Sequence, residues 1–422
     1  VGYSSGRAVY EEACVAGRLV SRGWNGSGFV GFDDGRIDPA CTPVPQSFWL
    51  EVGGELLAQG WEWRGMESAR GDEGRSSAAV TLEHPGRGVR VVVRTALDGT
   101  DVLARHLELT NTGSASAPIS ACGVWSGPLQ RLKRWRERLV DRDAAGLYSV
   151  GYFDNPRWGN EGDFRWRPLP AARLAVDGRY RRDRHRHPWL VLRSNATGEH
   201  FVLQLAWSGG YSLELDLSAD ASDPDAVLCL RAGPDAPAPL RVLEPGETAV
   251  TPVVHLGVVF GGLDEAVNAM HAHLRASVLL PQPRGRGGWV ESGIGPEVEI
   301  TPERVEAAID DAAVVGAEVF FVDASWYGAP RSSWWNTVGD WDVSRERFPD
   351  GLAPLRARAR ERGMLWGLWM DAERLGSESR AAREHPEWLA AAYDGERRLG
   401  GLIDLTNPAA ARWMEEAISR VV

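Results

Sequence analysis

Short hydrophobic runs separated by turn-forming residues fill the chain from about residue 7 to residue 257. Runs such as FWLEVGGELLAQGWEW and HFVLQLAWSGGYSLELDL alternate apolar with polar positions, and Gly, Pro, Asp and Asn cluster between the runs. A period of two is typical of strands that have one buried face. Because many such runs follow one another with hardly any helical spacing, we predict an N-terminal antiparallel β-sandwich of two packed sheets over residues 1–262.

The hydrophobic pattern changes to helical spacing at Leu263. In LDEAVNAMHAHLRASVLLP, apolar residues recur near every fourth position between Ala266 and Val278, and a proline ends the run. The stretch PQPRGRGG that follows is rich in Pro, Gly and Arg, which is typical of a connection between domains. We therefore predict a linking helix and linker over residues 263–286.

Strand and helix patterns alternate in the last part of the chain, residues 287–422. The helical segment TPERVEAAIDDAAVVG, with Thr301 as its N-cap, lies between the apolar segments GGWVESGI and AEVFFVD, which indicates a βαβ unit. A helix from Leu352 to Arg362, the strand MLWGLWMD and a last helix from Pro408 to Val421 follow. Apolar strands that alternate with helices are typical of a parallel sheet buried on both faces.

A (β/α)8 barrel fits this alternation best. The whole barrel takes roughly 250 residues, so residues 287–422 hold about its first three βα units. The predicted fold class is thus a multidomain chain, with an N-terminal antiparallel β-sandwich followed by an incomplete (β/α)8 barrel. Three parallel strands by themselves leave unpaired backbone at both sheet edges, so we expect this part to have low stability on its own.

Charge and composition exclude several classes of partner. The net charge of −11 disfavours nucleic-acid binding, because phosphate binding needs clustered positive charge. The longest apolar run, Ala312–Val322, is interrupted by Glu318 and is too short to cross a membrane, which takes about 20 residues. The first residues lack the pattern of a signal peptide, so we expect a cytoplasmic location. The four cysteines lie far apart, without the close spacing of zinc sites, so we expect buried thiols.

Polar and aromatic residues follow the predicted barrel strands at the end where barrel active sites form. The second strand leads into Asp323 and Trp326, and the third strand places Trp369, Asp371 and Glu373 at alternating positions, on one side if the extended conformation continues. Indole rings beside carboxylates suit a sugar, which has an apolar face and hydroxyls that need charged acceptors. The alternative is that Asp323 is a turn carboxylate, that Trp369 is a core tryptophan, and that Asp371 and Glu373 are loop charges.

A long tryptophan-rich loop, YGAPRSSWWNTVGDWDVSRERFPDGL, connects these two strands. It contains Trp335, Asp340 and Trp341. Long loops at the carboxyl face of a barrel commonly carry function rather than only connect strands. We therefore expect this loop to lie over the candidate site.

The chain contains, in this order, the segments WSGGYSLELDL, LEPGETAVTPVVHLG, GLDEAVNAMHAHLRASVLLP, FFVDASWYG, VGDWDVSRERFPDGLAPL, RGMLWGLWMDAER, HPEWL and GLIDLTNPAAARWM. Their sequence and spacing resemble glycoside hydrolase family 36, the α-galactosidases also called melibiases. The resemblance is clear from Trp207 to Met414 and loose in the earlier sandwich. It implies a large N-terminal β-sandwich, a catalytic (β/α)8 barrel and a small C-terminal β domain.

The resemblance also implies an activity, namely release of terminal α-linked galactose from oligosaccharides with retention, without cofactor or metal. Retention needs two carboxyl groups about 5 to 5.5 Å apart. The resemblance places the nucleophile and the acid/base beyond Val422, so we expect no catalytic carboxylate in this chain and no activity from the chain alone. Relatives often form homo-oligomers through the sandwich, which is expected here too.

The resemblance assigns individual sugar contacts. Asp323 would hold hydroxyls of the terminal sugar, Trp369 would line its apolar side, and Arg398 would contact it, with Arg397 as the alternative arginine. The predicted substrate-binding set is Asp323, Trp326, Trp369, Asp371, Glu373 and Arg398.

The segment after the second strand departs from the family pattern. The family has a second acid and a glycine after the first acid, and Ala324 and Ser325 stand there in this chain. One hydroxyl acceptor is thereby lost, which could shift the preference to an N-acetylated or other α-sugar. The alternatives are therefore an α-N-acetylgalactosaminidase or transglycosylase of the same family, and a non-catalytic carbohydrate-binding protein.

Overall fold

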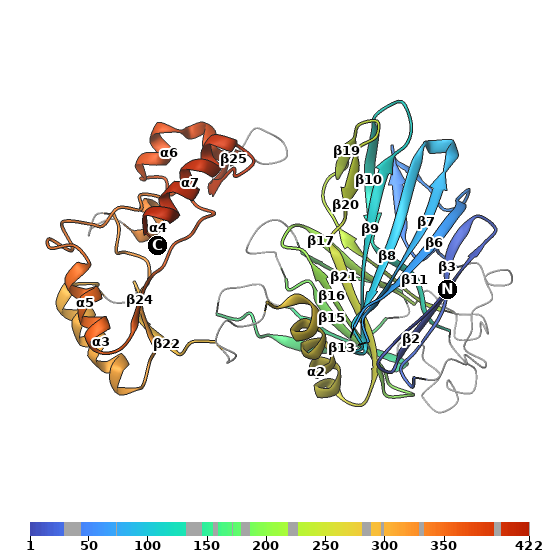
Figure 1. Ribbon diagram of the computed structural model, residues 1–422, viewed down its shortest axis with the longest axis horizontal. Coiled ribbons are helices and arrows are strands. Elements are labelled where there is room, and N and C mark those ends of the chain that lie inside the picture. Colours follow the sequence, from blue (N-terminus) through green and yellow to red (C-terminus); the bar gives the residue numbers. More distant parts are fainter. Residues whose placement is uncertain are drawn as a thin grey trace. The chain divides into compact units, whose positions relative to one another are not determined.

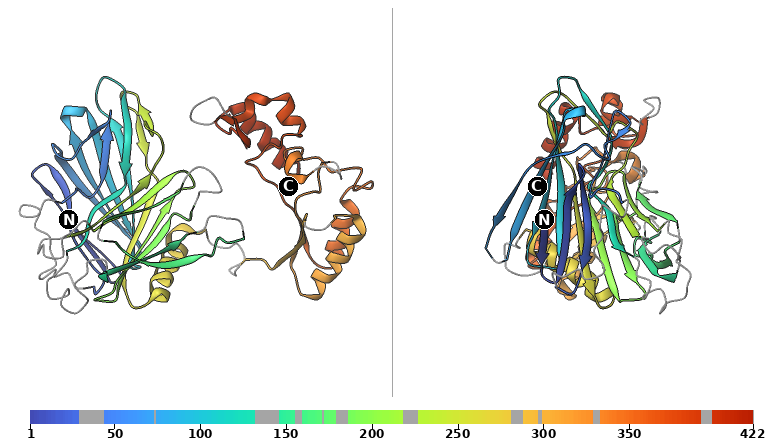
Figure 2. Two further views of the ribbon diagram at one scale, coloured as in Figure 1. Left: turned by 180° about the vertical axis from the view of Figure 1, so that it is seen from behind. Right: turned by 90° about the vertical axis from the view of Figure 1, so that its right-hand side faces the viewer.

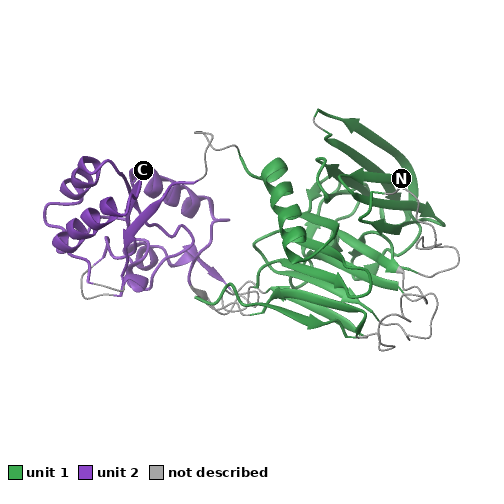
Figure 3. Ribbon diagram, turned by 90° about the horizontal axis from the view of Figure 1, so that it is seen from below, with its two compact units in different colours: residues 1–280 green, residues 281–422 purple. Residues whose placement is uncertain are grey.

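The computed structural model divides the chain into two compact units, Val1–Leu280 and Pro281–Val422 (Figure 3). The structure describes the following residues: 1–28, 44–72, 74–131, 146–154, 159–170, 172–178, 186–217, 227–280, 288–296, 299–328, 333–391 and 398–421. In this part of the chain, none of the helices has the length and apolar character needed to cross a membrane.

The first unit consists mainly of antiparallel strands (Figure 1). They are β1 (Gly2–Ser5), β2 (Ala8–Val15), β3 (Arg18–Asn25), β4 (Trp49–Val52), β5 (Glu55–Leu56), β6 (Glu62–Arg70), β7 (Ser76–His84), β8 (Val89–Leu97), β9 (Val102–Asn111), β10 (Ala117–Gly123), β11 (Trp125–Arg131), β12 (Tyr148–Phe153), β13 (Phe164–Pro168), β14 (Arg173–Gly178), β15 (Trp189–Ser194), β16 (Glu199–Ala206), β17 (Tyr211–Asp216), β18 (Val227–Pro234), β19 (Arg241–Leu243), β20 (Thr248–Val250) and β21 (Val253–Phe260), with a 3₁₀ turn η1 (Pro85–Arg87).

These strands pair into sheets that join distant parts of the sequence. The largest sheet has the order β13-β12-β15-β16-β21-β9-β8-β7-β6, and β20 also pairs with β9. Smaller sheets have the orders β1-β2-β3, β19-β10-β4-β5 and β11-β18-β17-β14. Because β21 lies directly beside β9, the last long strand of the unit closes against one from its first half.

The alternation read from the sequence decides which side chains enter the core. In β8, Val89, Val91 and Val93 are buried, whereas Arg90 and Arg94 at the intervening and following positions are exposed. Successive side chains of a strand point to opposite faces, so the valines share the inner face of the sheet. The predicted half-buried strands are therefore present.

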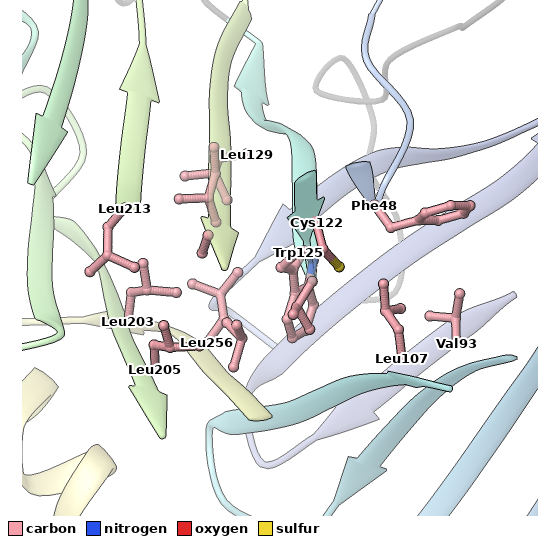
Figure 4. Close-up of a cluster of buried hydrophobic side chains, with 14 of the residues drawn as sticks. Phe48, Val93, Leu107, Cys122, Trp125, Leu129, Leu203, Leu205, Leu213 and Leu256 are labelled. Carbon is pink, nitrogen blue, oxygen red and sulfur yellow. The ribbon is translucent and has the colours of Figure 1, made fainter. Parts of the chain in front are cut away.

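One hydrophobic core lies between the sheets of the first unit. Figure 4 shows Val93, Leu107, Trp125, Leu203 and Leu256 gathered in it from β8, β9, β11, β16 and β21. All five are almost completely buried, and full burial of each such side chain contributes roughly 1.5–3 kcal/mol. Sheets packed face to face over a shared core confirm the predicted β-sandwich.

Helix α2 (Leu263–His273) and the π-helical turn η4 (Leu274–Val278) follow the last strand of the sandwich. Ala266 and Met270 of α2 are buried in one cluster with Val191 and Val202, which belong to β15 and β16. Figure 2 shows α2 lying along these strands. The predicted linking segment 263–286 thus begins with a helix that packs on the sandwich, and its residues 281–286 lie outside the described part of the chain.

The second unit has a parallel sheet with the order β22-β23-β24. Its strands are β22 (Glu291–Ile294), β23 (Val319–Val322) and β24 (Leu365–Leu368), its helices are α3 (Pro302–Val314), α4 (Trp334–Thr337), α5 (Ala353–Glu361), α6 (Arg380–Glu384) and α7 (Pro408–Val421), and η5 (Pro386–Trp388) precedes the antiparallel pair β25 (Leu389–Ala391) and β26 (Arg398–Ile403). Parallel strands that alternate with helices confirm the predicted incomplete (β/α)8 barrel.

Both faces of β23 are covered by packed side chains. Phe320 is buried in one cluster with Val305 and Ile309 of α3, so the helix covers this face of the sheet. Phe321 points to the opposite face, where a Cβ added to Gly293 would lie only 2.6 Å from its ring. At position 293 of β22, only glycine leaves room for the Phe321 side chain.

Candidate functional site

Asp323 and Trp369 are neighbours at the carboxyl edge of the parallel sheet. The register pairs Val322 of β23 with Leu368 of β24, so the residues that follow these two strands lie side by side. The pairing extends past the strands, because Asp323 N donates to Ile294 O at 2.9 Å and Trp369 N donates to Val322 O at 2.9 Å. The sheet thus brings together two predicted site residues that are 46 positions apart in the sequence.

The carboxylate of Asp323 is half-buried and forms part of its own turn. Its Oδ1 accepts a hydrogen bond from Ala324 N at 2.6 Å. Its Oδ2 has no hydrogen-bond partner among the described residues. This contact fits the alternative in which Asp323 is a turn carboxylate. Its Oδ2 is still able to accept a hydrogen bond from a ligand hydroxyl.

Ala324 and Ser325 complete this turn. Ala324 is buried, and Ser325 adopts the left-handed conformation with φ 82°. The carbonyl of Ser325 accepts a hydrogen bond from Arg347 Nη1. A left-handed non-glycine residue is strained, and here the guanidinium helps to hold the turn.

Trp326 and Trp341 are buried tryptophans that pack near the ends of the parallel strands. Trp326 Nε1 donates to Trp369 O at 2.8 Å, which ties the turn after β23 to the end of β24. The rings of Trp326 and Trp341 stack with their centroids 6.1 Å apart, and both residues are almost fully buried. Both tryptophans therefore pack in the core of the second unit.

Tyr327 is a feature of the site that the sequence interpretation did not assign. Its ring contacts Trp341 at 4.9 Å and Trp369 at 6.5 Å. Burial raises the pKa of Tyr327, and the negative charges of Asp371 and Asp323 raise it further. Its hydroxyl is buried and has no hydrogen-bond partner among the described residues. The signal in the sequence was only its place directly after Trp326.

Asp371 lies in a turn rather than in a continued strand. Strand β24 ends at Leu368, and Asp371 Oδ1 accepts a hydrogen bond from Glu373 N at 3.1 Å. Asp371 Oδ2 forms an ion pair with Arg374 Nε at 3.2 Å, and both side chains are largely buried. The extended conformation that would place Trp369, Asp371 and Glu373 on one side therefore does not continue. Glu373 is exposed in the turn.

The tryptophan-rich loop reaches this end of the sheet through Trp334. The Trp334 ring packs edge-to-face against Trp369 at 5.5 Å and against Trp335 at 4.9 Å. Asp340 has a different role, because its two carboxylate oxygens accept hydrogen bonds from Arg380 N at 2.8 and 2.9 Å. Asp340 therefore holds the start of α6, whereas the tryptophans contact the candidate site.

Arg398 is the first residue of β26, where its backbone pairs with Ala391 of β25. Its side chain and the whole of Arg397 lie outside the described residues. The predicted arginine contact therefore stays a prediction.

A cavity of about 440 Å³ borders the buried tryptophans. It is lined by Trp326, Trp341, Asp342, Val343, Leu352, Ala353, Arg356, Trp366, Leu368, Arg420 and Val421. Neither Asp323 nor Asp371 lines it, whereas the predicted site residues Trp326 and Trp341 do. Among the described residues, no group of three or more His, Cys, Asp or Glu side chains could hold a metal ion.

Residues 251–422 match the family model Melibiase. The chain is 24% identical over 362 residues to α-galactosidase AgaA of Geobacillus stearothermophilus, which is 83% of this chain and 48% of AgaA. The chain thus spans about half the length of this curated relative.

Solved structures of related proteins match the whole chain. The family 36 α-galactosidase AgaB of Geobacillus stearothermophilus has a TM-score of 0.80 at 18% identity, covering 100% of this chain and 62% of AgaB. A doubly substituted AgaA from the same organism, in complex with raffinose, has a TM-score of 0.79 at 17% identity, covering 100% of this chain and 63% of that chain. These likenesses show the fold.

Proposed function

Because residues 251–422 of this chain belong to the melibiase family, we propose that the protein containing it is a retaining glycosidase that releases terminal α-linked galactose from oligosaccharides. The observation that carries this proposal is the position of Asp323 beside Trp369 at the carboxyl edge of the parallel sheet. Barrel enzymes form their active sites at this edge. A carboxylate acceptor beside an indole ring matches the polar and apolar faces of a sugar.

In this proposal the chain binds and orients the terminal sugar. Asp323 accepts hydrogen bonds from its hydroxyls through the free oxygen, and Trp369 stacks against its apolar face. Asp371, which pairs with Arg374, is a further polar group that follows β24. Arg398 is the arginine that the family resemblance assigns to the sugar. The second-strand carboxylate thus positions the substrate and does not attack it.

The two catalytic carboxyl groups have no assigned residue in these 422 positions. Retaining hydrolysis needs a nucleophile and an acid/base about 5 to 5.5 Å apart. The proposal places both outside this chain and needs no cofactor. The proposal also includes the formation of homo-oligomers through the sandwich. Analytical ultracentrifugation would measure the oligomeric state.

The raffinose complex of AgaA supports an oligosaccharide substrate for this protein as well. Ala324 supports a second candidate, an α-N-acetylgalactosaminidase, because the buried methyl group stands where the family resemblance has a second acid. With one acceptor fewer, the site would hold the galactose hydroxyls less tightly. The choice between these sugars is therefore a question for a direct comparison of substrates.

The test is an assay of the protein expressed from the complete reading frame that contains this chain. The substrates are p-nitrophenyl α-galactoside, its α-N-acetylgalactosaminide and its α-glucoside. We expect turnover of the galactoside, and a fall of kcat/KM by about 100-fold in Asp323→Asn, because the charged hydrogen bonds to the sugar are lost.

The matched control is Asp342→Asn, which removes a carboxylate from the same unit. Asp342 is 65% exposed and pairs with Arg380 at 3.4 Å, so kcat/KM should not change. Residues 1–422 by themselves should show no turnover. Turnover by residues 1–422 alone, or full activity of Asp323→Asn, would contradict the proposal. Selective turnover of the N-acetylgalactosaminide would favour the second candidate, and sugar binding without any turnover would favour a binding protein.

A further inference from the structure

Trp335 is the exposed tryptophan of the loop at the candidate site. It is 39% exposed, whereas Trp326 and Trp341 are almost fully buried. The guanidinium of Arg374 lies over the Trp335 ring, with its central carbon 3.8 Å from the ring centroid. One face of the indole is therefore covered by a cation, and the remaining surface is accessible to a ligand.

The backbone that carries Trp335 is firmly held in place. Gly376 N donates to Val338 O at 2.7 Å, and Glu378 N donates to Asn336 O at 2.8 Å. A Cβ at Gly376 would lie 2.2 Å from Asn336 O and 2.7 Å from Trp335 O, so the two segments approach too closely for any residue but glycine. A ring fixed before binding loses little conformational entropy when a ligand stacks on it.

Two sets of contacts connect Trp335 to the predicted sugar contacts. Trp334 packs edge-to-face against both Trp335 and Trp369, so a single ring separates Trp335 from the wall of the site. Arg374 lies over Trp335 and forms an ion pair with Asp371 at 3.2 Å. The exposed ring and the half-buried site residues thus belong to one continuous network.

We propose that Trp335 is the stacking platform for the second sugar ring of the substrate, the ring that leaves as the aglycone. The inference rests on the proposed function, because it needs a terminal galactose bound at Asp323 and Trp369. A pyranose ring presents an apolar face that packs well on an indole. The platform therefore favours oligosaccharides whose galactose is attached to another sugar over galactosides with a small leaving group.

The experiment compares two substrates in the protein expressed from the complete reading frame. Melibiose carries a second sugar ring, and α-galactosyl fluoride carries only fluoride. We expect Trp335→Ala to lower the ratio of kcat/KM for melibiose to kcat/KM for the fluoride by about tenfold, which is what loss of one aromatic stacking contact accounts for. Trp335→Phe keeps an aromatic face and should retain most of this ratio.

The matched control is Trp207→Ala, which removes an exposed tryptophan from the first unit and should leave the ratio unchanged. If the ratio is unchanged in Trp335→Ala, whether both kcat/KM values fall together or neither falls, Trp335 is not a stacking platform. The proposed function is not affected by that result. Hydrolysis of the fluoride shows that each variant is folded and that the galactose site is intact. If the unsubstituted protein hydrolyses neither substrate, the proposed function fails and the platform fails with it.

Discussion

Ser325 adopts a left-handed backbone conformation, φ 82°, directly after the strand end that carries Asp323. A side chain in this region is strained by roughly 1–2 kcal/mol. We expect Ser325→Gly to raise the free energy of unfolding by about 1 kcal/mol, because relief of strain exceeds the extra chain entropy of glycine. Urea unfolding of the two proteins measures the difference. A lower free energy of unfolding in the variant would contradict this account.

A buried chain of hydrogen bonds in the first unit makes stability depend on pH. His273 Nδ1 donates to Asp98 Oδ2 at 2.7 Å, and His255 Nδ1 lies 2.8 Å from His273 Nε2. Burial, together with a smaller effect of His273, lowers the pKa of His255 from 6.5 to about 4, whereas Asp98 opposes the shift. His255 is therefore neutral in the folded protein at neutral pH.

The lowered pKa of His255 predicts a loss of stability in mild acid. Below pH 6.5 the unfolded chain binds a proton at His255 that the folded protein does not accept until about pH 4. Stability from this group is complete above pH 6.5 and should fall by on the order of 2–3 kcal/mol as the pH drops to 4. Urea unfolding at pH 7 and pH 4.5 measures this difference in the free energy of unfolding. His255→Phe should show a smaller fall, and equal falls in both proteins would contradict the assignment.

At the scale of elements, the parallel sheet of the second unit and the largest sheet of the first unit differ in how fully their strands are paired. In the described part of the second unit, β22 and β24 each pair only with β23, and Leu365 of β24 is 51% exposed. In the first unit, β8 and β9 are paired on both sides and contribute to a large core. Unpaired strand edges and exposed apolar residues leave little to oppose local opening.

This difference predicts a ranking in hydrogen exchange. We expect the amides of β22 and β24 to exchange at least about 100-fold faster than those of β8 and β9, which corresponds to about 3 kcal/mol in opening free energy. Strand β23, which has a partner on each side, should be the best protected strand of its sheet and serves as the internal control. Equal protection of β22, β24, β8 and β9 would show that the small sheet is as stable as the sandwich.

At the scale of the whole molecule, the two units take different parts in the proposed activity. The first unit has its own core and its own sheets, and the residues proposed to hold the sugar all lie in the second unit. The melibiase match covers the end of the first unit and the described strands of the second. In this proposal, the activity depends on the second unit together with the catalytic carboxyl groups that the proposal places outside this chain.

The sequence was a good guide to local structure. Helix α7 has the predicted bounds, and Thr301 Oγ1 accepts a hydrogen bond from Arg304 N as the predicted N-cap of α3. Helix α5 differs from its predicted bounds by one residue at each end. Apolar spacing and caps act between residues a few positions apart, so they can be read directly from the chain.

The sequence also predicted that Asp323 and Trp369 would meet at strand ends, because parallel strands of a βα unit share one carboxyl edge. It could not say that Asp340 would hold α6 or that Asp371 would pair with Arg374. These contacts depend on turns whose direction is decided by the segments packed against them. The same applies to the end of the extended conformation before Glu373.

The sequence by itself thus determined the periodicities, the two kinds of sheet and the residue types available at the strand ends. Only the tertiary structure decided which tryptophans of the loop are buried and that Trp335 is exposed beneath Arg374. It also placed β21 beside β9 and packed α2 on the sandwich. Periodicity comes from backbone geometry over a few residues, whereas burial and pairing depend on contacts between segments far apart in the chain.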